Sequence, residues 1–187
     1  MESLDDILLE SDDKMAKALE FFRQEMAGLR TGKASPSLVE HIAVEYYGAQ
    51  TRLREIANIT APEARLLVIS PYDPTSLAAI EKAILAANLG VTPINDGRII
   101  RIPIPELSEE RRREMVKVAR KMAEDARVAI RNIRRDANEE IKALQKNSKI
   151  TEDERDEGLE QIQKFTDSYI EKVDALLEQK ERELMQV

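Results

Sequence analysis

The longest regular pattern in the chain runs from Ser108 to Lys146, where no Gly or Pro interrupts a series of strong helix formers. Ser108 provides an N-cap, and Glu109 and Glu110 place negative charge at the positive end of the helix dipole. We therefore predict a single helix of roughly 57 Å, at about 1.5 Å per residue. Apolar residues at three- and four-residue spacing predict its buried face, namely Met115, Val118, Met122, Ala126, Ala129, Ile133, Ala137 and Leu144.

The opposite face of this helix is basic and rich in arginine. It comprises Arg113, Lys117, Arg120, Arg127, Arg131, Arg134 and Arg135. A face that is merely solvated usually mixes both charge signs at i,i+4 spacing, whereas only Glu124 interrupts this one. Guanidinium groups are planar, always charged and matched in geometry to phosphate. We therefore interpret the face as a phosphate-contacting surface, with a solvated face as the alternative.

Two further long helices are predicted at the ends of the chain. Ser3–Asp6 and Thr151–Glu154 both have the pattern of a capping box. The apolar positions that follow are Leu8, Met15, Leu19, Phe22, Met26 and Leu29 in the first helix, and Leu159, Ile162, Phe165, Tyr169, Val173, Leu176 and Leu184 in the last. Three long helices with one narrow apolar stripe each should form an antiparallel three-helix bundle.

The segment from 31 to 105 has a different character. Residues 39–47 and 51–56 suggest two strands, and 65–70 is a short apolar run typical of a buried strand. A helix is predicted from Pro74 to Gly90, then a turn at 95–97 and an edge strand over 98–104, which contains Pro103. This pattern predicts a small α+β module.

The fold class is therefore α+β, with residues 1–30 and 106–187 as the three-helix bundle and residues 31–105 as an inserted α+β domain. Two short segments that are incompatible with a helix connect the parts. A hinge is predicted at these crossings, formed by Thr31, Gly32, Pro103, Ile104 and Pro105.

Composition and charge restrict the function. The 187 residues are 42% hydrophobic and 35% charged, with a formal net charge of −7. Residues 109–146 nevertheless carry 12 basic and 8 acidic side chains, and they form the only net positive segment. A polyanion would meet this face and be repelled elsewhere, so its binding should depend strongly on salt. The absence of Cys excludes disulfides and thiol catalysis, and no signal peptide or membrane span is apparent, so we expect a soluble cytoplasmic protein.

Catalytic chemistry finds no support in the sequence. His41 is the only histidine and has no neighbouring nucleophile, the acidic clusters lack the spacing of a calcium loop, and no glycine-rich phosphate loop is present. We predict a binding protein that is not an enzyme and needs no metal or cofactor. Two alternatives remain, a protein whose arginine face meets an acidic partner surface and an enzyme in the α+β module. Salt-sensitive binding to rRNA would distinguish the first, and a test for GTP hydrolysis the second.

Several longer motifs resemble the bacterial ribosome recycling factor family. They are RTGKASP (30–36), VEYYG (44–48), the segment from Pro105 to Arg113, VAIRNIRRDAN (128–138) and KEREL (180–184). The motifs occur in the family's order and span nearly the whole chain. Lys33 stands where the family usually has Arg, which keeps the charge and loses the fork geometry of a bidentate phosphate contact.

The resemblance implies an L-shaped protein with the outline of a transfer RNA. Members of the family bind the ribosome after termination and, with elongation factor G hydrolysing GTP, split it into subunits. The bundle of these proteins lies on large-subunit rRNA. Carried over to this sequence, the rRNA-binding residues are Arg30, Lys33, Arg127, Arg131, Arg134 and Arg135. The expected partners are the ribosome and elongation factor G, without a membrane, and the expected oligomeric state is a monomer.

Overall fold

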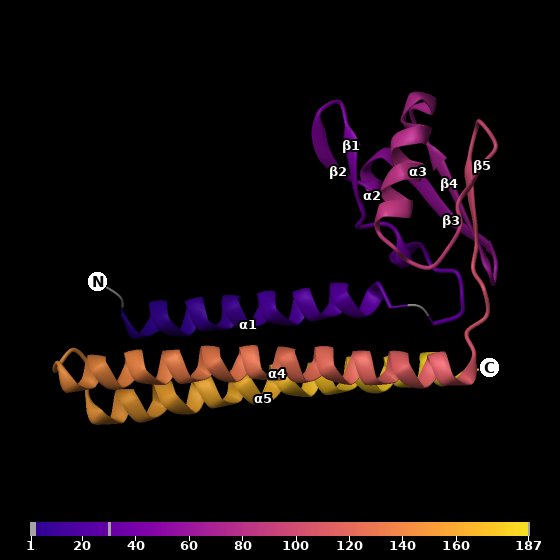
Figure 1. The fold of residues 1–187 in the computed structure, drawn as a ribbon. Coiled ribbons are helices and arrows are strands. Elements are labelled where there is room, and N and C mark those ends of the chain that lie inside the picture. The colour runs from indigo at the N-terminus through magenta and orange to yellow at the C-terminus, as the bar shows by residue number, and fades with distance from the viewer. Residues whose placement is uncertain (1–2, 30, 187) are drawn as a thin grey trace. The chain divides into compact units, whose positions relative to one another are not determined.

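The protein is described from a computed structural model, which covers residues 3–29 and 31–186. The chain forms, in order, α1 (Leu4–Ala27), a 3₁₀ turn η1 (Pro36–Leu38), β1 (Ala43–Tyr46), β2 (Ala49–Arg52), α2 (Leu53–Ile56), β3 (Ala57–Glu63), β4 (Leu66–Pro71), a 3₁₀ turn η2 (Pro74–Ser76), α3 (Leu77–Ala86), β5 (Ile94–Asn95), β6 (Ile100–Pro103), α4 (Glu109–Lys146) and α5 (Glu152–Met185) (Figure 1).

The chain divides into two compact units. One comprises Met1–Met26 and Val116–Val187, and the other Ala27–Met115. The first turns of α4 therefore group with the second unit. The domain boundaries that the sequence suggested, after residues 30 and 105, stay a prediction.

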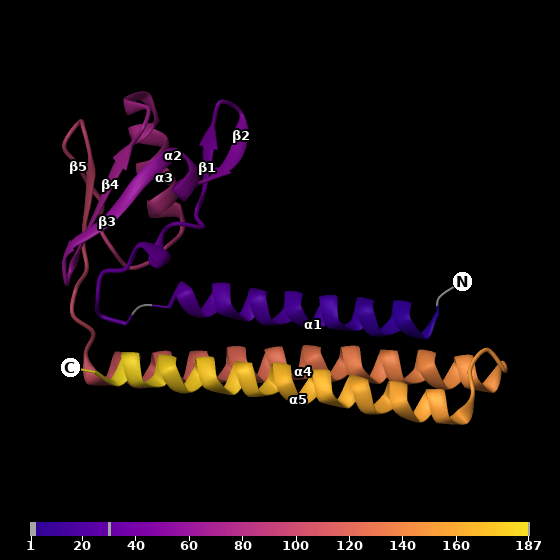
Figure 2. The ribbon, with the colours of Figure 1, turned by 180° about the vertical axis from the view of Figure 1, so that it is seen from behind.

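The first unit is a three-helix bundle formed by α1, α4 and α5 (Figure 2). Ile7 of α1, Ile141 of α4 and Ile162 of α5 meet in one buried cluster. Farther along, the Tyr169 hydroxyl of α5 donates a hydrogen bond of 2.7 Å to Asp12 Oδ1 of α1. From the first contact to the second, the residue number rises in α1 and also in α5. These two helices are therefore parallel, and α4 is antiparallel to both. The expected three-helix bundle is confirmed.

Capping fixes where these helices begin. In α1 the backbone N of Ser3 donates to Asp6 Oδ2, and the backbone N of Asp6 donates to Ser3 Oγ, each at 3.1 Å. Thr151 and Glu154 form the same reciprocal pair at the start of α5. Each pair satisfies backbone N–H groups that have no acceptor within the first turn. Both capping boxes that the sequence predicted are therefore present.

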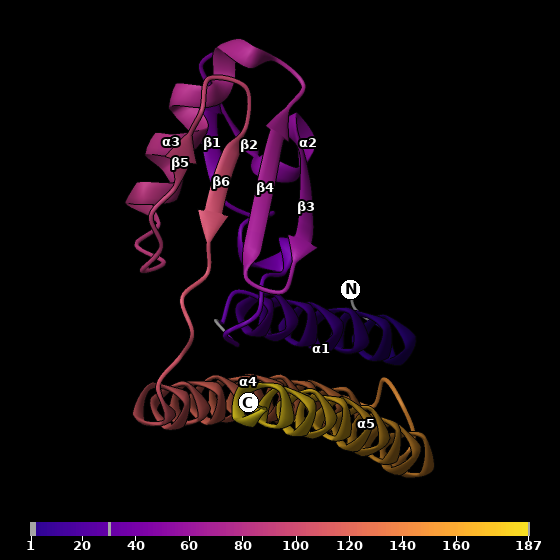
Figure 3. The ribbon, with the colours of Figure 1, turned by 90° about the vertical axis from the view of Figure 1, so that its right-hand side faces the viewer.

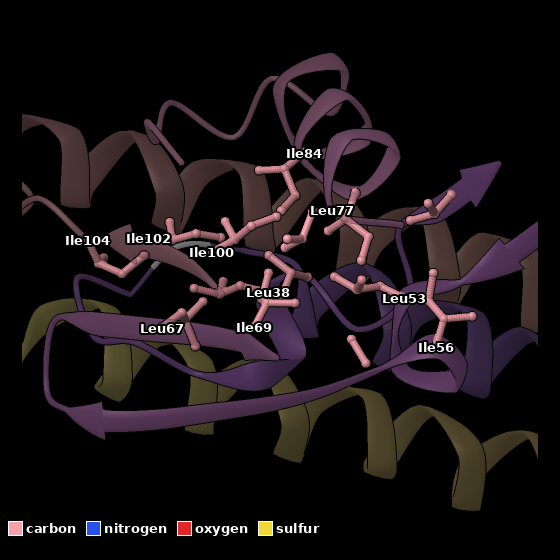
Figure 4. Packing of buried hydrophobic residues seen from close by; sticks show 14 residues of the cluster. Leu38, Leu53, Ile56, Leu67, Ile69, Leu77, Ile84, Ile100, Ile102 and Ile104 are labelled. Carbon is pink, nitrogen blue, oxygen red and sulfur yellow. The ribbon is translucent and has the colours of Figure 1, made fainter. Parts of the chain in front are cut away.

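The second unit contains a small sheet core. Four antiparallel strands pair in the order β3-β4-β6-β5, and β1 and β2 form a separate hairpin (Figure 3). Helix α3 packs its buried Leu77, Ile80 and Ile84 against strand residues that include Ile69 and Ile100 (Figure 4). The apolar run at 65–70 is thus a buried strand, as the sequence indicated.

Several expectations for this unit differ from the structure. Of the expected strand 39–47 only Ala43–Tyr46 forms a strand, and the helix expected from Pro74 to Gly90 is the 3₁₀ turn η2 followed by α3, which ends at Ala86. Residues 53–56 of the expected strand 51–56 form the helical turn α2, which buries Leu53 and Ile56. Strand β3 was not expected, because its residues ANITAPE lack clear alternation. Strand β6 is not an edge strand, since β4 pairs along its whole length and the short β5 pairs with Ile100 and Arg101 on the other side.

Candidate nucleic-acid interface

Helix α4 carries the arginine-rich face that the sequence predicted. Ser108 begins the helix, because its Oγ accepts a hydrogen bond of 3.1 Å from the backbone N of Arg111. The helix continues without a break to Lys146. The site residues Arg127, Arg131, Arg134 and Arg135 therefore share three turns of one rigid element.

The buried stripe of α4 differs from the predicted one. Its buried members are Arg112, Val116, Ala119, Ala123, Ala126, Ile130, Ala137 and Ile141. Of the predicted members, Ala126 and Ala137 are buried, whereas Val118 is 37% exposed and the remaining five are half-buried. At 100° per residue the stripe is rotated by roughly 60° toward the arginines. Arg127 and Arg134 consequently lie at the edge of the helix seam, and Arg131 and Arg135 lie farther into solvent.

Arg127 braces α4 against α5. Its Nη2 and Nε lie 2.7 and 2.8 Å from Asp174 Oδ1, and its Nη1 lies 3.2 Å from Glu124 Oε2. The side chain is only 20% exposed. Burial works against the charged form, but the hydrogen bonds to Asp174 and Glu124 outweigh it and raise the pKa of Arg127. Arg127 is therefore a permanent cation that is already engaged by two carboxylates.

The other three arginines are held more loosely. Arg131 Nη1 lies 3.3 Å from Glu124 Oε1, and the Arg131 side chain is 46% exposed. Arg134 Nη1 donates to Gln163 Oε1 of α5 at 3.4 Å, near the limit of a hydrogen bond. Arg135 Nη2 donates to Asn132 Oδ1 at 2.9 Å. Each guanidinium keeps N–H donors beyond these contacts, because the group has five.

These three arginines line one surface hollow of about 510 Å³. The full lining is Val128, Arg131, Asn132, Arg134, Arg135, Asn138, Glu139, Lys142 and Gln163. Four of these side chains are cationic, and Glu139 is the one acidic member. The hollow can therefore accept an anion with several charge-assisted hydrogen bonds, and its amides and exposed Val128 can contact an uncharged group beside that anion.

Lys142 and the amides Asn132, Asn138 and Gln163 were missed by the sequence interpretation. A signal for Lys142 and Asn138 was present, because residues 131, 135, 138 and 142 repeat at four- and three-residue spacing and so form one line along the helix. No comparable signal exists for Gln163. It belongs to α5, and its place beside α4 depends on how the two helices pack.

Of the other predicted contact residues that the structure describes, Arg127 and Lys33 are not among the residues that line the hollow. Arg30 lies outside the described residues. Lys33 belongs to the second unit and has an exposed side chain. A shared phosphate surface of Lys33 and the α4 arginines therefore stays a prediction.

The predicted hinge residues lie in the second unit. Gly32 has φ +82°, which favours glycine, and a Cβ added there would lie 3.8 Å from Leu107 Cγ. Ile104 is 3% exposed and belongs to the sheet core, and its backbone N donates to Arg65 O at 2.8 Å. The backbone N of Ala34 donates to Ala64 O at 2.7 Å. The entering and leaving segments are thus both fixed to the β3–β4 turn.

Other kinds of site find little support among the described residues. Residues 3–29 and 31–186 contain no group of three or more His, Cys, Asp or Glu side chains placed to hold a metal ion. His41 Nε2 lies 3.5 Å from Glu40 Oε1, in a pair that is about one third exposed. Among those same residues, no helix has an apolar stretch of the length that crossing a bilayer requires.

Comparison with known proteins points to one family. A family model described as ribosome recycling factor matches residues 22–185. The ribosome-recycling factor of Bacillus licheniformis is 55% identical over 181 residues, which cover 97% of this chain and 98% of that protein. A solution structure of a ribosome recycling factor matches with a TM-score of 0.81 and 44% identity, over the full length of both chains.

A second structural match comes from a ribosomal assembly. It contains the Thermus thermophilus ribosome recycling factor with Escherichia coli elongation factor G, bound to the E. coli post-termination complex. The matching chain has a TM-score of 0.69 and 46% identity, covering 99% of this chain and 100% of that one. Since the family model and the relatives match nearly the whole length, this chain belongs to the ribosome recycling factor family.

Proposed function

We propose that this protein recycles ribosomes after termination. Together with elongation factor G and GTP hydrolysis it would separate the subunits and so release them from mRNA. The single observation that carries the proposal is the arginine-lined hollow on α4, in a chain similar over its full length to ribosome recycling factors. The protein would act in the cytoplasm as a monomer that catalyses no reaction itself, and its partner would hydrolyse the GTP.

Large-subunit rRNA is the proposed ligand of the arginine face. Arg131, Arg134 and Arg135 offer spare guanidinium donors around one concave surface, and Lys142 adds a fourth cation. Phosphate oxygens match such donors bidentately. Arg127 would contribute mainly through the field of its charge, because Asp174 and Glu124 already engage its three nitrogen atoms and its side chain is only 20% exposed. Arg30 and Lys33 are proposed as further rRNA contacts.

The residues that connect the two parts would act as pivots. Thr31, Gly32 and Pro105 lie outside the helices and strands, whereas Ile104 is held in the sheet core. Rotation there would let residues 31–105 move as a rigid inserted domain while the bundle stays on rRNA. Force from elongation factor G would then reach the bundle through this domain.

The deciding experiment is a subunit-splitting assay on post-termination ribosomes, with elongation factor G and GTP, with and without this protein. We expect splitting to require all three components. Arg134→Ala should reduce splitting, whereas Arg182→Ala should not, because Arg182 is an exposed arginine of α5 outside the hollow. Absence of splitting by the wild-type protein would contradict the proposal.

A binding assay separates rRNA from an acidic protein surface as the ligand. Protein-stripped large-subunit rRNA should bind the wild-type chain with an affinity that falls steeply with salt, by a log–log slope of about −0.7 to −0.9 per phosphate contacted. Binding that is lost with the ribosomal proteins would instead favour the acidic partner. Hydrolysis of GTP by the isolated chain would contradict the non-enzymatic assignment.

A further inference from the structure

One residue that lines the hollow, Asn138, has a buried polar atom without a hydrogen-bond partner among the described residues. Within residues 3–29 and 31–186, Asn138 Oδ1 is a buried side-chain acceptor that receives no hydrogen bond. Four cationic side chains line the same hollow, yet none donates to it. A buried acceptor without a partner costs free energy, and most such atoms in folded proteins are satisfied. The bundle therefore carries a local cost at this position that leucine or alanine would avoid.

Position 138 does not require a polar residue for packing. It lies next to the buried Ala137 on α4 and is itself half-buried. Asparagine is also a poorer helix former than alanine or leucine. Neither local propensity nor an internal hydrogen bond thus accounts for the amide, whereas a ligand that donates a hydrogen bond would account for it.

The lining of the hollow indicates the chemistry of this ligand. Arg131, Arg135 and Lys142 favour an anion, and the Asn138 amide needs a partner with an N–H donor. Val128 is 44% exposed and offers an apolar contact in the same hollow. A nucleotide combines a phosphate, a base edge with donors and acceptors, and a flat apolar base face. The volume of about 510 Å³ also lies in the range of about 300–1,000 Å³ that pockets for compact organic ligands occupy.

We propose that the hollow takes one unstacked nucleotide of the bound RNA, with its phosphate on Arg131 and Arg135 and its base edge on the Asn138 amide. This inference rests on the proposed function and names a residue that reads a base rather than the backbone. Proteins recognise RNA mainly through bases that have left the stack, and an Asn amide pairs best with adenine, which offers a donor and an acceptor side by side. Rotation about χ1 and χ2 brings the amide toward the base, and Oδ1 has no hydrogen bond to lose in that movement.

The test is Asn138→Ala in the full-length chain, measured by binding to purified large ribosomal subunits at several salt concentrations. We expect about a tenfold loss of affinity, the size of a good base contact. The slope of log affinity against log salt should stay unchanged, because no phosphate contact is removed. The melting temperature should stay equal or rise, because the unpaired acceptor is gone.

Two controls define the comparison. Arg131→Ala should lower the affinity and make the salt slope shallower by about one phosphate contact. Asn147→Ala should bind as the wild type does, because Asn147 is an exposed asparagine just after α4 and lies outside the hollow.

Asn138→Leu is a second test of the same residue. Leucine keeps a similar side-chain volume without hydrogen bonding, so this variant should reproduce the affinity loss of Asn138→Ala in a fully folded protein.

Each outcome bears on a different statement. Wild-type affinity of Asn138→Ala beside a weakened Arg131→Ala overturns the base contact and leaves the proposed function standing. Wild-type affinity of both variants, and of Arg134→Ala, contradicts the proposed rRNA contact itself. If both Asn138 variants melt at lower temperature and lose affinity only to the extent that they unfold, Asn138 is structural and the inference is overturned.

Discussion

Arg127 of α4 and Asp174 of α5 are in direct contact, with Arg127 Nη2 2.7 Å from Asp174 Oδ1. The Asp174 side chain is 54% exposed, whereas that of Arg127 is 20% exposed. The arginine therefore lies in the helix seam and its partner lies at the rim. This geometry separates Arg127 from the three arginines of the hollow and leads to the first prediction.

Arg127→Ala should lower the free energy of unfolding by about 1 kcal/mol, the upper end for a pair that is partly exposed. Asp174→Ala should cost less, because Glu124 still accepts from Arg127. Urea unfolding of both single variants and the double variant measures the coupling between the two side chains. If Arg127→Ala unfolds at the wild-type urea concentration, the brace contributes nothing.

Arg134→Ala should weaken ribosome binding without loss of stability. Its long contact to Gln163, at 3.4 Å, contributes little to the fold, and alanine is a strong helix former. Arg134→Lys should recover only part of the affinity, because an ammonium group keeps the charge and lacks the planar fork. Thermal melting and equilibrium binding to large subunits check both statements. Full recovery by lysine would mean that charge alone matters at this position.

Gly32→Ala should lower stability by about 1–2 kcal/mol, because φ +82° is unfavourable for a residue with a Cβ. Steric crowding is not the cause, since a Cβ at position 32 would lie 3.8 Å from Leu107 Cγ, which is an ordinary van der Waals distance. Gly32→Asn should be milder, because Asn tolerates this conformation. If Gly32 is a pivot, both variants should reduce subunit splitting more than ribosome binding. Equal losses in the two assays would count against the pivot.

Tyr169→Phe should remove the hydrogen bond to Asp12 and lower stability by about 1–2 kcal/mol at pH 7. Burial, assisted by Asp12, raises the pKa of Tyr169 above its usual value to about 12. A raised pKa contributes stability that is fully present below pH 10 and is lost as the pH rises through about 12. The stability difference between wild type and Tyr169→Phe should therefore shrink across this interval. Denaturant unfolding at pH 7 and at pH 11 measures it, and a constant difference would show that the hydroxyl does not titrate as expected.

Much of the bundle follows from local patterns in the sequence. Ser3 with Asp6 and Thr151 with Glu154 are short-range signals that fold as the sequence predicts, because their hydrogen bonds involve residues three apart. The inserted unit was less predictable. Residues 53–56 have apolar side chains at both ends, which suit a strand or a single helical turn, and tertiary contacts decide between them.

The rotation of the α4 stripe has a similar cause. Val116 and Ile130 are buried together with small alanines such as Ala119 and Ala123, which allow neighbouring helices to approach closely. The sequence prediction counted the large apolar residues Met115 and Val118 as buried. It therefore placed the centre of the buried stripe farther from the arginines than the structure does. The charge of the arginine face was predictable from the positions of the basic residues along 109–146. Its division into a braced Arg127 and a hollow around Arg131 depends on α5, and hence on packing.

The turn between β3 and β4 has a consequence for how the length of this chain can vary. Surface loops ordinarily accept extra residues. Here the carbonyl of Ala64 receives the backbone N–H of Ala34, and the neighbouring carbonyl of Arg65 receives that of Ile104. One inserted residue would move one carbonyl away from its partner and thereby misalign a segment far away in the sequence. We therefore expect insertions at this exposed turn to be tolerated as poorly as insertions in a buried strand, whereas the Tyr47–Gly48 turn, whose Gly48 Cβ position is open on all sides, should accept them.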